Sequence, residues 1–135
     1  MSRDDVNGIV EIAQPLGPIM AITPVTNPTS TVMFKALISL KTRNPVIFSP
    51  GQRAMKCCTE TARICYEAAL AAGAPEDCIQ VLPEASRGLT HALMTHKSIA
   101  LVLATGGPGL VQAAYSSGTP TIGVGPGNVP VFIDK

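Results

Sequence analysis

The sequence predicts an α/β fold in which a doubly wound parallel sheet forms a single domain. The chain has 135 residues, which is within the usual length of one domain. Short apolar runs alternate with segments whose apolar residues recur at helical spacing, a pattern typical of parallel strands joined by helices. Several of these runs end in turns rich in glycine or proline. Right-handed crossovers bring the carboxyl ends of such strands to one edge, where we expect a ligand site.

The first half of the chain is expected to form an arm, two strands and two helices. Residues 1–17 are interpreted as an N-terminal arm or strand, and residues 18–135 as the domain. The expected elements are a strand at 18–22, a helix at 29–42, a strand at 45–48 and a helix at 53–72. The apolar positions that indicate the first helix are Val32, Met33, Ala36, Leu37 and Leu40. Gly73, with Pro75 after it, is a stop signal for the second helix.

The second half is expected to continue the alternation. The predicted elements are a strand at 78–82, a helix at 84–96, a strand at 99–104, a helix at 108–117, and strands at 121–124 and 129–133. The run at 99–104 lacks polar alternation, which predicts a strand buried on both faces near the centre of the sheet. The inner face of the helix at 53–72 is expected to be lined by small residues, namely Ala54, Cys57, Cys58, Cys65, Ala68, Ala69 and Ala72.

Composition excludes several classes of partner. The net charge of +1 does not favour binding to nucleic acid or to an anionic membrane. No apolar run approaches the roughly 18–20 residues of a membrane span, and the polar start is unlike a signal peptide. The four cysteines have neither zinc-site spacing nor the pattern of a disulfide scaffold, so we expect free thiols and a cytoplasmic location. The two histidines, five residues apart, are a poor metal pair, and no metal site is predicted.

Charged residues are unusually scarce. They make up 14% of the chain, against about 25% in typical soluble domains. A small domain exposes a large share of its surface, so a normal solvated surface would need more charge. The low charge content indicates that much of the surface is covered, either in a homo-oligomer or within a larger protein. The alternative is a monomer with an apolar surface.

Three turns are candidates for a nucleotide site. They are residues 23–28, 105–111 and 123–128, each following a strand-like run. Glycines at such turns let a pyrophosphate approach the backbone, although a tight turn without a ligand is the alternative. The chain has neither the full G-x-G-x-x-G pattern nor the lysine of a P-loop. At the end of the second strand of the domain, Ser49 could bind a ribose hydroxyl. Arg53 could favour a 2′-phosphate, but an exposed arginine at a helix start is the preferred interpretation, so NAD and NADP both stay open.

Together these turns carry a family resemblance over nearly the whole chain past Val10. The chain resembles the aldehyde dehydrogenase superfamily in its CoA-acylating branch, closest to the acetaldehyde dehydrogenase part of bifunctional aldehyde-alcohol dehydrogenases. The stretches that carry the resemblance include Thr23-Pro24-Val25-Thr26-Asn27-Pro28, Ala104-Thr105-Gly106-Gly107-Pro108-Gly109 and Gly123-Val124-Gly125-Pro126-Gly127-Asn128, with residues 34–44, 47–50, 72–77 and 114–118.

The resemblance implies a Rossmann-like NAD-binding domain over residues 18–135. It implies that the cofactor is lined by the first turn, comprising Ile22, Thr23, Pro24, Val25, Thr26 and Asn27, and touched by Gly107 and Gly125. Hydrolytic relatives have an asparagine for the oxyanion in this turn; Thr26 falls at that position, and Asn27 lies next to it. They also have a lysine for the adenine ribose where Ser49 stands, and a water-activating glutamate where Gly123 stands.

The implied reaction is oxidation of a small aldehyde by NAD⁺, with coenzyme A as the acyl acceptor. The family's nucleophilic cysteine belongs to a separate catalytic domain, and none of the four cysteines here is at its position. The chain is therefore expected to be the cofactor-binding segment of an acylating oxidoreductase and to be inactive alone. The alternative is a non-catalytic nucleotide-binding or assembly module with the same fold.

Overall fold

A five-stranded parallel sheet organises the domain. The computed structural model describes residues 2–127 and 129–134. The strands are β3 (Ile19–Thr23), β4 (Val46–Pro50), β5 (Ile79–Val81), β6 (Leu101–Thr105) and β7 (Thr121–Val124), in the order β5-β4-β3-β6-β7. All four pairings in this sheet are parallel, so the predicted α/β class and parallel sheet are confirmed.

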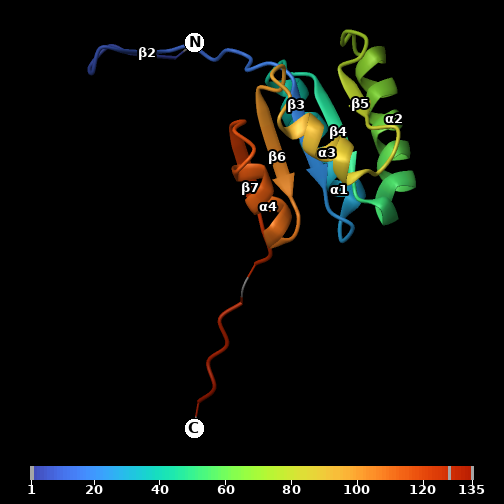
Figure 1. Ribbon diagram of the computed structural model, residues 1–135. Coiled ribbons are helices and arrows are strands. Elements are labelled where there is room, and N and C mark those ends of the chain that lie inside the picture. The colour runs from blue at the N-terminus through green and yellow to red at the C-terminus, as the bar shows by residue number, and fades with distance from the viewer. Residues whose placement is uncertain (1, 128, 135) are drawn as a thin grey trace.

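Helices cover both faces of the sheet (Figure 1). One face packs against α1 (Pro28–Lys41) and α2 (Met55–Ala71), around a core that includes Val32, Phe48 and Cys58. The other packs against α3 (Arg87–Met94) and α4 (Pro108–Tyr115), around Met20 and Val102. A short 3₁₀ turn (Gln52–Ala54) leads into α2. The sheet is therefore doubly wound, as the sequence predicts.

The most deeply buried strand is β3 and not β6. All five residues of β3 are buried, because it is the central strand and has helices on both faces. In β6, Val102 and Ala104 are buried, whereas Leu101, Leu103 and Thr105 are only partly covered. The prediction that the run at 99–104 lies near the centre is confirmed, because β6 pairs with β3. The prediction that this run is buried on both faces is wrong. On the face of the sheet that carries α1, no described helix fully covers the side chains of β6.

The buried faces of two helices differ from those expected. In α1 the buried residues are Thr31, Val32, Lys35, Ala36 and Ser39, while Met33 and Leu37 are exposed. In α2 the buried residues are Cys58 and Ala62, while Ala68 and Ala72 are exposed. Which face of a helix is buried depends on where the sheet lies and on the tilt of helical side chains toward the N-terminus. The positions of apolar residues alone therefore do not identify the buried face.

Segments at both ends of the described chain are exposed. Strands β1 (Ser2–Asp4) and β2 (Ile9–Glu11) form an antiparallel hairpin that projects away from the sheet (Figure 1). Residues 129–134 contain no strand, so the strand predicted at 129–133 is wrong. Its apolar side chains, which include Val131 and Phe132, are at least 80% exposed, and no described strand offers them backbone partners.

Candidate functional site

The three turns predicted to bind a nucleotide lie at one edge of the sheet. Because β3, β6 and β7 run parallel in adjacent positions, the turns that follow them leave the same edge. The turn after β4, which begins at Gly51, joins them there, and the Cγ1 of Val25 lies 3.1 Å from where a Gly51 Cβ would be. Asn128, the last residue of the third turn, lies outside the described residues.

A groove of about 740 Å³ opens at this edge on the α3–α4 side. Its floor includes Ile22 and Thr23 at the end of β3 and Ser49 at the end of β4. Its walls come from α3, through Ser86, Arg87 and Thr90, and from α4, through Gly109 and Leu110. The groove therefore crosses the carboxyl ends of the central strands, where α/β proteins bind nucleotides.

Ser49 is the predicted ribose contact, and it lies in this groove. Its side chain is 3% exposed, and its Oγ lies 2.9 Å from Oγ1 of Thr90. Thr90 Oγ1 also donates to the carbonyl oxygen of Ser86, at 2.8 Å. Because Thr90 uses its hydroxyl hydrogen on Ser86, Ser49 donates to Thr90. The Ser49 oxygen can still accept a hydrogen bond, for example from a ribose hydroxyl.

A second, smaller hollow of about 340 Å³ lies on the α1 side of the same edge. Asn27, Lys35, Thr105 and Val124 are among the residues that line it. Asn27 is the N-cap position of α1 but makes no side-chain cap, and its Oδ1 accepts a hydrogen bond from Thr26 Oγ1. The structure thus brings the predicted residues to one edge but divides Asn27 and Ser49 between two hollows.

Lys35 links two of the strands at this edge. Its side chain is 4% exposed, and its Nζ donates to the carbonyl oxygens of Ile22, at 2.6 Å, and Leu103, at 2.7 Å. Burial lowers the pKa of Lys35 to about 8, because a charged ammonium loses hydration there. The side chain of Lys35 therefore ties together the ends of β3 and β6, immediately before the turns that follow them.

The glycines at the edge are of two kinds. A Cβ at Gly106 would lie 2.6 Å from Leu110, and one at Gly123 would lie 2.7 Å from Val111 and 2.8 Å from Tyr115. Gly123 is therefore needed for packing against α4, whereas at Gly106 the end of the flexible Leu110 side chain could move aside. A Cβ at Gly107 or Gly125 would meet nothing within 4 Å. The φ of Gly107 is −67°, which any residue adopts, so neither backbone nor packing requires glycine there.

The remaining first-turn residues differ in exposure. Thr23 is buried, with its Oγ1 3.4 Å from the Sγ of Cys58, and Pro24 is half-buried. Val25, Thr26 and Asn27 are exposed. Side chains that follow Thr23 are therefore accessible to a ligand at the edge.

The four cysteines are free thiols, and Cys58 and Cys78 are buried. Burial raises the pKa of the Cys58 thiol and of the Cys65 thiol, which keeps both protonated near neutral pH. Among residues 2–127 and 129–134 there is no cluster of side chains suited to a metal ion, and no helix long and apolar enough to cross a membrane.

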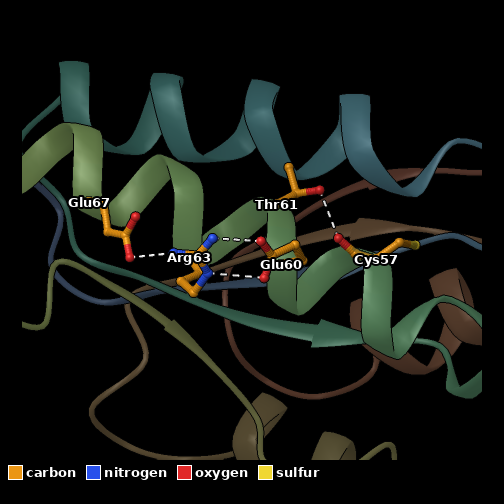
Figure 2. A network of polar contacts seen from close by, with 5 residues as sticks. All are labelled: Cys57, Glu60, Thr61, Arg63 and Glu67. Atoms are coloured by element: carbon orange, nitrogen blue, oxygen red, sulfur yellow. Dashed lines mark hydrogen bonds and ion pairs between the residues drawn. The ribbon is translucent and has the colours of Figure 1, made fainter.

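The outer face of α2 carries solvated charge (Figure 2). Arg63 forms ion pairs with Glu60, at 2.6 Å, and with Glu67 one turn further on. Thr61 Oγ1 donates to the carbonyl oxygen of Cys57, at 2.7 Å. All three charged side chains are at least half exposed, so the pairs contribute little to stability and form no part of the site.

Sequence reasoning missed Lys35, Arg87 and Thr90. Lys35 lies four residues from each of the buried residues Thr31 and Ser39, so helical spacing places it on the buried face. Its positive charge instead favours an exposed position, and the spacing alone does not decide between the two. Arg87 and Thr90 come from α3, far along the chain from Ser49, and only tertiary packing brings them to the groove. Arg53 is exposed, as the preferred interpretation of the sequence expects, and it is not among the groove-lining residues, so the alternative role at a 2′-phosphate gains no support.

Comparison with known proteins gives consistent matches. A model of the aldehyde dehydrogenase family matches residues 2–123. The bifunctional aldehyde-alcohol dehydrogenase AdhE of Escherichia coli K12 is 57% identical over 135 residues, which cover 100% of this chain and 15% of that protein. The curated relatives it matches are much longer, and the chain spans 15% to 29% of their length.

Solved structures agree in fold. An acetylating aldehyde dehydrogenase from Geobacillus thermoglucosidasius superposes with a TM-score of 0.92 at 56% identity, covering 96% of this chain and 28% of that one. The propionaldehyde dehydrogenase of Rhodopseudomonas palustris with bound propionyl-CoA has a TM-score of 0.82 at 39% identity, covering 86% of this chain and 26% of that one. The Rossmann-like fold implied by the resemblance is thus shared with both.

Proposed function

The chain belongs to the aldehyde dehydrogenase family, and from this premise we propose that it is the NAD-binding segment of a CoA-acylating aldehyde dehydrogenase. The reaction of the whole enzyme converts a small aldehyde, coenzyme A and NAD⁺ to acyl-CoA, NADH and a proton. The relatives named acetylating or aldehyde-alcohol dehydrogenases support this assignment. The enzyme is proposed to be a cytoplasmic homo-oligomer, and the exposed apolar surface of this chain supports association.

The observation that carries the proposal is the open space over Gly107. A glycine that neither its φ nor its neighbours require is expected where a ligand passes close to the backbone. Gly125, on the adjacent turn, has the same open space. We therefore assign Gly107, Gly125 and the turn from Ile22 to Asn27 to the dinucleotide, with Ser49 on the adenine ribose.

The bound dinucleotide supplies the hydride acceptor, and the thiol chemistry needs a cysteine other than the four in this chain. The raised pKa of Cys58 and Cys65 disfavours a thiolate at either of them. The role of this segment is to orient the cofactor against the thiohemiacetal formed elsewhere in the enzyme. We propose the amide of Asn27, or the hydroxyl of Thr26 beside it, as the hydrogen-bond donor to the oxyanion, and the exposure of both side chains supports this role.

Packing at Gly123 supports transfer of the acyl group to coenzyme A. Hydrolytic relatives have a glutamate base at this position, as the resemblance implies. Here a side chain would overlap Val111 and Tyr115, and the Gly123 amide donates to the Tyr115 hydroxyl, at 3.1 Å. No carboxylate can occupy that position without displacing Tyr115, so nothing there activates water to hydrolyse the acyl-enzyme. A thiol acceptor is then the favoured route.

The test is NADH binding by the intact protein, by a glycine variant and by a control variant. In Gly107→Val the new side chain points into open space, so we expect a folded protein that binds NADH at least about tenfold more weakly, a loss of about 1.4 kcal/mol. Ala71→Val is the control for added bulk, because Ala71 is exposed at the end of α2 and lines neither hollow, and it should bind NADH normally.

Binding is measured by the change in NADH fluorescence, with circular dichroism as the check on folding. Equal NADH affinity in wild type and Gly107→Val would contradict the site. NADH binding without turnover by the 135-residue chain would agree with a cofactor segment, whereas turnover would show a self-sufficient enzyme. Absence of both would favour the alternative, a non-catalytic assembly module.

A further inference from the structure

The groove beside Ser49 has an unusual distribution of charge. In dinucleotide-binding α/β folds an acidic residue after the second strand holds the ribose hydroxyls of NAD, and an arginine accommodates the 2′-phosphate of NADP. Here β4 ends in Ser49 and Pro50, followed by Gly51 and Gln52, and no carboxylate is among the described groove-lining residues. The ionisable side chains that line the groove are Arg87 and His91.

The backbone at Arg87 is fixed by the turn that precedes it. It is the first residue of α3, and Ser86, the N-cap, accepts a hydrogen bond from the amide of Leu89. Thr90, one turn further along, is the residue whose hydroxyl pairs with Ser49. Residues three apart on a helix are neighbours, so Arg87 lies beside the Ser49–Thr90 pair.

Arg87 also has a free guanidinium. Within residues 2–127 and 129–134 it forms no ion pair and no side-chain hydrogen bond, in contrast to Arg63 with its two glutamates. Its cation is therefore available to an anion that enters the groove. A phosphate next to a ribose hydroxyl on Ser49 would meet this guanidinium and no opposing carboxylate.

We propose that the groove accepts an adenosine whose ribose carries a phosphate monoester, with Arg87 as the group that binds this phosphate. The inference rests on the proposed function and deepens it, because it concerns the same nucleotide site. Two ligands of the reaction class carry this chemistry: NADP, with a 2′-phosphate, and coenzyme A, with a 3′-phosphate. We therefore expect Arg87 to contribute to the binding of at least one of these two phosphorylated ligands.

The experiment compares phosphorylated and unphosphorylated ligands in the intact protein. Dissociation constants are measured for NADPH and NADH, and for coenzyme A and 3′-dephospho-coenzyme A, in wild type and in Arg87→Gln. Arg53→Gln is the matched control, because it removes the same charge from an exposed arginine next to Gln52 but outside the groove lining. Thermal unfolding of each variant checks that it is folded.

Arg87→Gln should weaken the binding of NADPH, of coenzyme A or of both about five- to tenfold, the magnitude of a charge-assisted hydrogen bond that is partly exposed to solvent. It should leave NADH and 3′-dephospho-coenzyme A unchanged. Arg53→Gln should change neither. A selective loss confined to coenzyme A, relative to its dephospho form, would support the phosphate contact and assign it to the 3′-phosphate.

Other outcomes overturn the inference. If Arg87→Gln leaves all four affinities unchanged, or weakens phosphorylated and unphosphorylated ligands equally, Arg87 does not bind a ribose phosphate. A protein that binds NADH but excludes both NADPH and coenzyme A would also refute the contact while leaving the proposed function intact. Failure to bind any of the four ligands would refute the proposed function itself.

Discussion

Lys35 shows how one buried charge can connect two strands at the edge of the sheet. Its Nζ bridges the carbonyl oxygens of Ile22 and Leu103, which belong to adjacent strands. The two turns proposed to hold the cofactor start within a few residues of these carbonyls. Removal of the amine would leave both oxygens without this partner, so Lys35 contributes to the spacing of the turns as well as to packing.

The pH dependence of stability should reveal this lysine. The ordinary pKa of 10.5 applies in the unfolded chain, and burial lowers the folded value to about 8. Below pH 8 both states are protonated and the folded state carries the full cost of the buried charge. Between pH 8 and 10.5 the unfolded state binds more protons, so the free energy of unfolding rises with pH, by up to about 3 kcal/mol.

Urea unfolding of wild type and Lys35→Met at pH 7 and pH 9.5 measures this effect. The neutral amine keeps two N–H groups, enough for both carbonyls, so the contacts survive loss of the proton. Wild type should gain stability relative to Lys35→Met as the pH rises, and subtraction of the variant removes the effect of the other lysines. Parallel pH profiles would show that Lys35 has an ordinary pKa.

At the scale of elements, the structure confirms Gly73 as the stop signal at the end of α2. Gly73 follows the helix with a φ of +88°, and its amide donates to the carbonyl oxygen of Leu70, at 2.9 Å. A Cβ at Gly73 would meet nothing within 4 Å, so the only cost of a side chain there is the left-handed backbone.

Gly73→Ala is therefore expected to lower the free energy of unfolding by about 1 kcal/mol. Gly107→Ala is the matched control for stability, since its surroundings are equally open but its φ is −67°. It should be neutral or stabilise by up to about 1 kcal/mol, because alanine restricts the unfolded chain. Chemical unfolding of both variants decides the matter, and equal costs would refute the role of φ.

Local sequence patterns predicted the order of the strands and helices of the sheet. Contacts between residues far apart in the sequence could be identified only in the folded structure. Strand β7 has the same limits as its prediction, and α1 and α4 begin at Pro28 and Pro108. The helix predicted at 84–96 is shorter, since Ser86 caps it and Thr95 ends it. The Ser49–Thr90 pair joins residues 41 positions apart, and no local pattern predicts such a contact.

At the scale of the whole molecule, apolar and charged surface are separated. The outer face of α2 carries the ion pairs of Arg63 (Figure 2). The outer face of α1 is apolar, with Phe34 62% and Leu37 68% exposed. On the same side of the sheet, Ile122 and Val124 of β7 are more than half exposed, and the side chains of 129–133 extend beyond it. We expect this apolar side of the domain to be covered in an interface, which would explain the scarcity of charge.

The isolated 135-residue chain is therefore expected to self-associate at micromolar concentration and to bind hydrophobic dyes. Leu37→Lys should reduce both, because it places a charge in the middle of the apolar face of α1, where Phe34 and Ile38 are also exposed. Ile64→Lys is the matched control: Ile64 is 55% exposed, but it stands next to the ion-paired Arg63 on α2, so its replacement should leave association unchanged. Light scattering and dye fluorescence measure the two effects. A monodisperse wild-type monomer without dye binding would show that these apolar side chains are tolerated in solvent, and the scarcity of charge would then need no covered surface.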